Sequence, residues 1–284
     1  MGYGSYTAHD WDKLKTSRKI DHTSTANTLF TSNKMLDKYN PKFINRRESR
    51  DNDEHPNSLP IAIGVDVTGS MGYLSEEIVK NSLNELMKKL YASSTIPDPQ
   101  LMFAAIGDAY VDQAPLQVTQ YEADIRIAEQ LLELWLEGNG GDSPEDYSLF
   151  WYFLANHTDI DCMKKRNKKG FAFTIGDAAN HDTLTASAIK KIFGDNVNNT
   201  LTKEEIVEQC EKNYNLFHIM IGDTRNVIPG KTIKISKSNV KFLPEIIITA
   251  ICKVEKIDPK DILGDLDQTV LDIIDNAFRH VTFD

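Results

Sequence analysis

The feature that most constrains the fold is a series of short apolar segments, each ending in an aspartate, that alternate with amphipathic segments. The first, IAIGVD, ends in Asp66, and three later ones end in Gly-Asp at Asp108, Asp177 and Asp223. Continuously apolar runs separated by helices are typical of parallel strands that are buried on both faces. The pattern therefore predicts an α/β fold with a mostly parallel sheet and helices on both faces.

The expected elements follow one another from residue 59 to the end of the chain. Strands are expected at 61–66, 100–108, 170–177, 215–223 and 240–243, with a short extended piece at 115–120. Helices are expected at 76–90, 121–138, 144–157, 184–193, 202–213, 244–256 and 259–280. The third helix is expected to start at Pro144, because proline beside acidic residues favours a first helical turn.

Residues 1–58 differ from the rest, with many Ser, Thr, Asn and Asp residues and no sustained hydrophobic period. They nevertheless carry more apolar side chains than a pure linker needs. These are Trp11, Leu14, Ile20, Leu29, Phe30, Met35, Leu36, Phe43 and Ile44. We expect an N-terminal arm over 1–58, lying extended on its own domain or on a neighbouring subunit, and one domain over 59–284.

Composition narrows the classes of partner. The net charge of -10 argues against a general nucleic-acid binder, which would gather Lys and Arg to neutralise phosphates. Three cysteines without a metal-binding spacing suggest a reducing compartment. The N-terminus lacks the apolar run of a secretory signal, and no stretch is apolar enough to span a membrane. A cytoplasmic protein that contacts neither nucleic acid nor membrane is expected.

The aspartates point to a cation site at one edge of the sheet. The carboxyl ends of parallel strands meet at one edge, where ligands bind in open α/β sheets. Gly-Asp after a strand is also good turn chemistry, and we favour that interpretation for Asp108 and Asp223. Asp66 is different, because Thr68 and Ser70 follow at a spacing that turns both hydroxyls toward one point. Mixed oxygen donors of this kind suit Mg²⁺, or Mn²⁺ as an alternative ion.

Three motifs carry a family resemblance. DVTGSMG resembles the Asp-x-Ser/Thr-x-Ser signature of the metal-ion-dependent adhesion site (MIDAS) in von Willebrand factor A (vWA) domains. GNGGDSPEDY and FTIGDAANH resemble later loops of the same family, especially its bacterial, phage and alpha-kinase-linked branch. The motifs occur in family order over residues 59–255. The resemblance implies a doubly wound, Rossmann-like six-stranded sheet with 115–120 as an antiparallel edge strand.

The resemblance also implies roles for five residues. Thr68 and Ser70 would touch the metal directly, while Asp66 and Asp177 would act mainly through bound waters. The third loop of the family normally supplies a Thr, whereas this chain has Asp142, with Ser143 next to it. A direct Asp142 carboxylate would retain the metal and disfavour a second, incoming carboxylate. We therefore expect a constitutive Mg²⁺ site that binds acidic partners weakly.

A catalytic interpretation of the same residues is the alternative. DVTGS resembles the phosphorylation loop of P-type ATPases, and GDAANHD resembles a metal motif of haloacid-dehalogenase (HAD)-like phosphatases. Asp66 would then be the nucleophile of a Mg²⁺-dependent phosphohydrolase, with Asp177 and Asp182 holding the ion. Phosphatases of this type need a second acid two residues after the nucleophile, where this chain has Thr68. We therefore favour a non-enzymatic protein.

The function expected from the sequence is metal-dependent binding of another protein, or of a second copy of the chain. A second binding hypothesis assigns assembly to the N-terminal arm and gives the metal a purely structural role. The histidines add little, since His181 is expected to close a loop and His218 lies on an apolar strand, where a core histidine is the commoner outcome.

Overall fold

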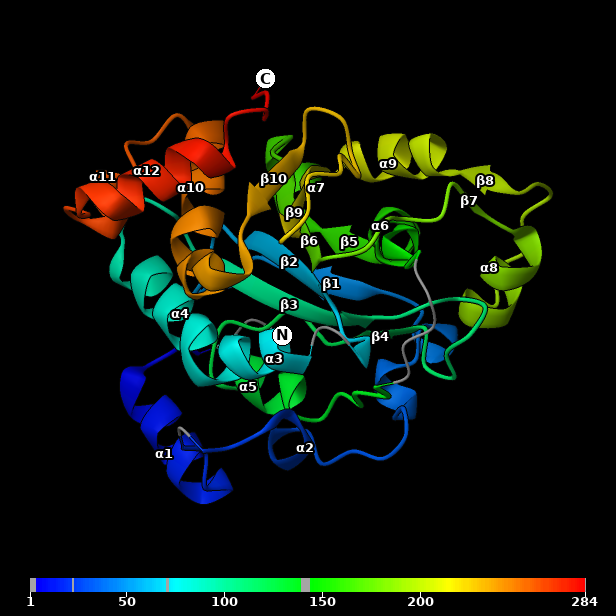
Figure 1. Cartoon of the computed structure of the whole chain (residues 1–284), viewed down its shortest axis with the longest axis horizontal. Helices are drawn as coiled ribbons and strands as arrows, with labels where there is room; N and C mark the ends of the chain where they lie inside the picture. The colour runs from blue at the N-terminus through cyan, green and yellow to red at the C-terminus, as the bar shows by residue number, and fades with distance from the viewer. Residues whose placement is uncertain (1–3, 22, 70–71, 139–143, 284) are drawn as a thin grey trace.

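The computed structural model describes residues 4–21, 23–69, 72–138 and 144–283, and a six-stranded sheet lies at its centre (Figure 1). The strands are β2 (Leu59–Asp66), β3 (Pro99–Ile106), β4 (Leu116–Val118), β6 (Gly170–Gly176), β9 (Tyr214–Ile221) and β10 (Thr232–Ile235). Their order is β10-β9-β6-β2-β3-β4, and every pair is parallel except β3 with β4. The prediction of an α/β fold with a mostly parallel sheet is confirmed.

Helices and two small strand pairs surround this sheet. The helices are α1 (Ala8–Arg18), α2 (Ala26–Leu29), α3 (Gly72–Glu77), α4 (Leu83–Ala92), α5 (Arg126–Leu131), α6 (Tyr147–Asn156), α7 (Asp161–Arg166), α8 (Ala186–Phe193), α9 (Lys203–Glu211), α10 (Leu243–Glu255), α11 (Lys260–Leu263) and α12 (Gln268–Ala277). A π-helical turn, Ile78–Ser82, joins α3 to α4. Short 3-10 helices span Asp37–Tyr39, Pro41–Phe43 and Lys237–Phe242. The small pairs are parallel β1 (Arg47–Ser49) with β5 (Thr158–Ile160) and antiparallel β7 (Thr183–Leu184) with β8 (Leu201–Thr202).

The side chains of β2 show why its sequence is apolar throughout. All eight of its residues are buried. Ile61 and Ile63 belong to a hydrophobic cluster shared with α4 and α10, whereas the intervening Ala62 belongs to a second cluster shared with α6, α8 and α9. Since successive strand side chains point to opposite sides, a strand packed on both sides can carry no polar face.

Several element boundaries differ from those predicted. The segment 240–243 is not a strand, because it lies at the junction of a 3-10 helix and α10, and the outermost parallel strand is β10. Helix α6 starts at Tyr147 rather than Pro144, since Glu145 pairs with Asn180 in an isolated bridge. The single helix expected over 259–280 is divided into α11 and α12 around Gly264, whose φ of 70° ends a helix. Of the helix expected over 121–138, only α5 forms.

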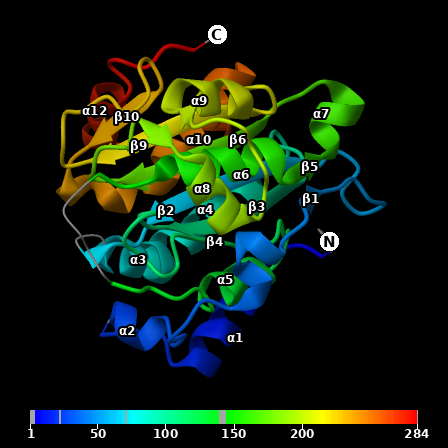
Figure 2. The same ribbon diagram turned by 90° about the vertical axis from the view of Figure 1, so that its right-hand side faces the viewer.

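The described part of residues 1–58 packs on the same core as the sheet. Trp11 and Leu14 of α1 and Leu29 of α2 are buried in the cluster that also contains α4 and β2. In both views α1 and α2 lie on the same side of the molecule as α5 (Figures 1 and 2). The Tyr6 hydroxyl donates to Asn84 Oδ1 at 2.6 Å. This segment therefore contributes directly to the hydrophobic core.

Ion pairs attach the end of this segment to β5 and α7. Arg50 contacts Asp159 at 2.9 Å and Asp161 at 2.8 Å. Asp51 pairs with Arg166 at 2.7 Å, and the hydrogen bonds from Arg166 and Ser58 outweigh partial burial, so that the pKa of Asp51 falls to about 2. Arg50 and Asp51 directly follow β1, so these ion pairs lie next to the β1–β5 strand pair and attach the segment to the same part of the domain.

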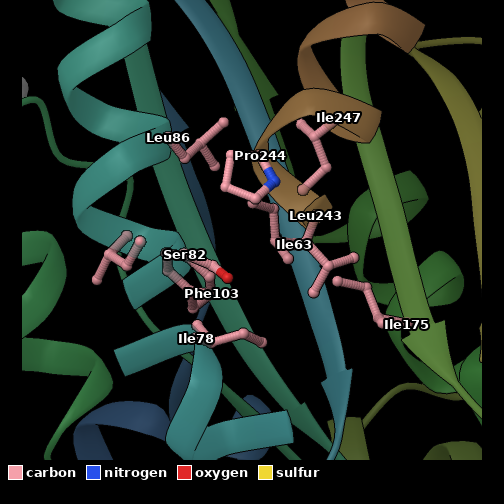
Figure 3. Close-up of a pocket in the computed structure, with 10 residues that line it drawn as sticks. Ile63, Ile78, Ser82, Leu86, Phe103, Ile175, Leu243, Pro244 and Ile247 are labelled. Carbon is pink, nitrogen blue, oxygen red and sulfur yellow. The ribbon is translucent and has the colours of Figure 1, made fainter. Parts of the chain in front are cut away.

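The cavity shown in Figure 3 indicates how closely the interior is filled. It lies between Phe103 of β3, Leu86 of α4 and Ile247 of α10, and its volume is about 20 Å³. Pockets for organic ligands are roughly 300–1,000 Å³. This cavity is therefore too small for an organic cofactor.

Across the described residues, every helix is too short or too polar to traverse a lipid bilayer.

His218 of β9 is a fully buried core histidine. Its Nδ1 lies 3.0 Å from the Thr174 hydroxyl, while Nε2 has no hydrogen-bond partner among the described residues. Burial lowers the pKa of His218 to about 3. An unfolded chain binds this proton near pH 6.5, so that stability is lost as the pH falls below about 6.5 and the loss levels off near pH 3.

This titration gives the first prediction. Between pH 7 and pH 5 the wild-type protein should lose about 2 kcal/mol more stability than His218→Gln, whose amide keeps a partner for Thr174 but does not titrate. Urea unfolding of both proteins at the two pH values measures the difference. Equal losses would show that His218 is already protonated, or solvated, in the folded protein.

Candidate metal centre at the carboxyl edge of the sheet

The predicted site residues that the structure describes lie at one edge of the sheet. Asp66 ends β2, Thr68 follows it by two residues, and Asp177 directly follows β6. Strands β2 and β6 are parallel neighbours with Val65 opposite Ile175, so that both acids leave the sheet at the same edge. The other two predicted ligands, Ser70 and Asp142, lie outside the described residues, as does Ser143.

Asp66 is fully buried and held from two sides. The Thr68 hydroxyl donates to Asp66 Oδ1 at 2.7 Å, and the Thr68 backbone N–H donates to the same oxygen at 2.9 Å. The Tyr147 hydroxyl of α6 donates to Asp66 Oδ2 at 3.3 Å. The pKa of Asp66 is raised to about 6, because burial and the charge of Asp177 together outweigh the hydrogen bonds from Thr68 and Tyr147. A negative charge at Asp66 is thus only partly compensated.

Glu145 is a third acid at this edge that sequence reasoning missed. It is buried, and Oε2 has no hydrogen-bond partner among the described residues. Burial and the charge of Asp66 together raise the pKa of Glu145 to about 8, although the nearby Thr68 hydroxyl opposes the shift. The segment GGDSPED was recognised as a site loop, but its glutamate was interpreted as a helix start. Its position near Asp66 depends on contacts between residues far apart in the sequence, which a local motif does not reveal.

Asp177 is less enclosed than the other two acids. Its Oδ2 lies 3.4 Å from Lys237 Nζ, which comes from the 3-10 helix before α10. The same ammonium lies 6.0 Å from the centre of the Tyr73 ring. Burial raises the pKa of Tyr73, and the charges of Asp177 and Asp66 contribute to the same shift. The tyrosine therefore lies near both acids.

The oxygen atoms of these groups are of the chemical type that hard divalent cations prefer. The described donors are carboxylate and hydroxyl oxygens, and Glu145 has a buried oxygen without a donor among the described residues. Two acids are hard to ionise here because burial and neighbouring negative charge disfavour the charged form. A dication would stabilise those charges. The residues present therefore fit Mg²⁺, with Mn²⁺ as an alternative.

A second group of acids follows β3. Asp108 Oδ1 accepts hydrogen bonds from the backbone N–H groups of Tyr110 and Val111 at 2.6 and 3.0 Å, which is the turn role expected from the sequence. Its other oxygen, Oδ2, lies 2.8 Å from His181 Nε2. Asp146 is fully buried beside this pair, and burial raises its pKa to about 6, while the neighbouring His181 opposes the shift.

No protein-family model and no curated protein matches this chain. Among solved structures, it is similar to two of the pilus adhesin SpaC from Lactobacillus rhamnosus GG, one of them in an open conformation. The TM-scores are 0.38 and 0.37 at 9% and 10% sequence identity. The matches cover 82% of this chain but only 31% and 32% of the adhesin, so the chain spans about a third of that protein.

Proposed function

We propose that the chain is a non-enzymatic vWA-type domain that holds Mg²⁺ at the carboxyl edge of its sheet and binds another protein, or a second copy of itself, through that edge. Thr68, Ser70 and Asp142 would contact the ion, with Asp66 and Asp177 in the outer shell. In this proposal the sheet is doubly wound and β4 is the antiparallel edge strand of the family. The protein acts in the cytoplasm and contacts neither nucleic acid nor membrane.

The observation that carries the proposal is the buried, hydrogen-bonded carboxylate of Asp66, with Thr68 attached to it and the charge of Asp177 close by. Neighbouring negative charges that are partly shielded from water are unfavourable without a counter-ion. Lys237 contacts Asp177 at 3.4 Å, whereas the more deeply buried Asp66 is held by Thr68 and Tyr147, which carry no charge. A hydrated dication between the loops after β2 and β6 would supply the missing positive charge.

Exposed apolar side chains beside this edge support a protein partner. Tyr73 is 37% exposed, Tyr110 50% and Val111 61%. Tyr73 follows β2, and the other two follow β3, which is the parallel neighbour of β2. Tyrosine is enriched at protein–protein interfaces, because its ring buries apolar area while its hydroxyl can still hydrogen-bond. A metal edge with aromatic groups beside it suits recognition of a protein surface.

The phosphohydrolase alternative is less well supported. Both carboxylate oxygens of Asp66 accept hydrogen bonds, one from Thr68 and one from Tyr147, and the residue is fully buried. A nucleophile must reach the phosphorus atom in line with the leaving group. Thr68, which stands where the general acid would be needed, donates to Asp66 instead. The arm-based assembly alternative also loses support, because Trp11 and Leu29 are buried in the chain's own core.

Affinity purification with the tagged full chain tests the proposed function. A partner, or a second copy, should be retained in Mg²⁺ buffer and released by EDTA, and Asp66→Asn should fail to retain it. Asp265→Asn is the matched control, because that carboxylate is exposed and its ion pair is with the exposed Lys260 at 3.0 Å. Retention that is equal with and without EDTA, and equal for Asp66→Asn, would contradict a metal-dependent interaction.

A further inference from the structure

The group formed by Asp108, Asp146 and His181 brings three different segments together. Asp108 follows β3, Asp146 immediately precedes α6, and His181 lies in the loop after β6. Each residue offers one ligand atom, and the three atoms all lie within 4.8 Å of one another. Within the group, His181 Nε2 lies 2.8 Å from Asp108 Oδ2.

Asp146 supplies an independent indication that a ligand is missing. The residue is 0% exposed, and its Oδ2 accepts one hydrogen bond from the Ala109 backbone N–H at 3.1 Å. Its Oδ1 is buried and has no hydrogen-bond partner among the described residues. A buried carboxylate oxygen without a donor is rare, because the loss of its hydration is uncompensated. A cation coordinated at this carboxylate would provide the compensation.

The ligand atoms are already held in place. Two backbone N–H groups fix Asp108 Oδ1 and leave Oδ2 directed at His181. The backbone N–H of Asp108 donates to Asp112 Oδ2 at 2.7 Å, which fixes the loop itself. The Tyr110 ring packs edge-on against the His181 ring, with centroids 5.4 Å apart. Such supporting contacts orient metal ligands and favour binding.

We propose that Asp108, Asp146 and His181 form a second metal site, selective for a transition-metal dication such as Zn²⁺. An imidazole nitrogen among carboxylates favours Zn²⁺ over Mg²⁺, which prefers oxygen ligands throughout. Three protein ligands leave at least one position open to water or to a group from a partner. The site differs from the oxygen-only centre at Asp66 in its donor set, and its existence does not depend on the proposed function.

This site is tested by titrating Zn²⁺ into the chelator-treated full chain in Mg²⁺ buffer and measuring the binding by calorimetry. We expect one Zn²⁺ per chain, with affinity reduced by about 100-fold or more in His181→Ala and in Asp146→Asn. His280→Ala, which removes an exposed histidine, should leave the Zn²⁺ affinity unchanged. Unchanged binding in His181→Ala would overturn the proposal, as would loss of binding in His280→Ala.

X-ray absorption on the zinc-loaded wild-type protein provides a second readout that does not depend on the folding of a variant. The expected spectrum shows oxygen ligands together with the outer-shell scattering of one imidazole ring. A spectrum with only oxygen ligands, or with two or more imidazoles, would overturn the assignment. If the proposed function fails while this spectrum is obtained, the second site stands alone.

Discussion

Asp66→Asn is expected to abolish the stabilisation that Mg²⁺ gives to the wild-type protein. For the wild type, a ligand at about 100 times its dissociation constant adds about 2.7 kcal/mol to the free energy of unfolding. The variant should gain nothing from the same Mg²⁺ concentration. Without metal, the order of stability reverses. The neutral amide would remove a buried charge whose pKa is raised to about 6, so that the Asp66→Asn variant should be more stable than the wild type at pH 7 by about 3 kcal/mol.

The variant should be the more stable protein without metal and should lack the stabilisation that Mg²⁺ gives the wild type. This combination distinguishes loss of a metal site from a general loss of stability. Denaturant unfolding at pH 7, with EDTA and with saturating Mg²⁺, gives four free energies for the two proteins. Asparagine can still accept the Thr68 hydrogen bonds, which limits other structural effects. Asp265→Asn serves as the control and should respond to Mg²⁺ as the wild type does. A full Mg²⁺ response in Asp66→Asn would exclude this carboxylate from the metal centre.

Trp11→Ala is expected to lower the free energy of unfolding by about 3–5 kcal/mol. The Trp11 side chain is among the largest fully buried groups of the described chain, and it belongs to the cluster that contains β2 and α4. Truncation therefore leaves a cavity in the main core and not merely a looser terminus. Thermal or urea unfolding of the full chain measures the effect.

The neighbouring His9→Ala is the matched control, because His9 lies on the same helix but is exposed. Its effect should remain within about 0.5 kcal/mol. A loss of less than about 1 kcal/mol in Trp11→Ala would show that α1 is only loosely attached in solution. That outcome would restore the hypothesis in which the N-terminal segment is free to mediate assembly.

The main sheet was largely predictable, because its strongest signal is local. The runs ending in Asp66, Asp108 and Asp177 are apolar on both faces, and they form the strands β2, β3 and β6. Asp66 is the last residue of its strand, and the other two aspartates follow theirs within two residues. Strand β10 was missed because it has only four residues and includes a half-buried lysine, Lys234. The alternating apolar residues at 240–243 were mistaken for that strand. Pro244 in the first turn of α10 shows that a helix starts there instead.

The site was predictable only where a motif lies within one loop. Asp66 and Thr68 are two residues apart, and their hydrogen bond follows from that spacing. Glu145 was missed because its environment is defined by Asp66, almost eighty residues earlier in the chain. His181 likewise meets Asp108 from a distant segment, so no local pattern could reveal their contact. Long-range pairs of this kind depend on the sheet order, which single-sequence patterns do not specify.

The N-terminal segment shows the same limit. Its apolar residues were recognised as anchors, and Trp11, Leu14 and Phe30 are buried. The helix that carries the first two was not predicted, because α1 is polar on average and has no clear hydrophobic period. Phe43, another expected anchor, is largely exposed. Composition thus indicates that such a segment packs, but not against which surface.

The most direct test of the central claim is anomalous scattering from crystals of the full chain soaked in Mn²⁺. We expect a peak between the loops after β2 and β6, at about 2.1–2.2 Å from Thr68 Oγ1, with Asp66 and Asp177 on bound waters. A map with no peak at this edge, or with a peak only at Asp108, Asp146 and His181, would contradict the account.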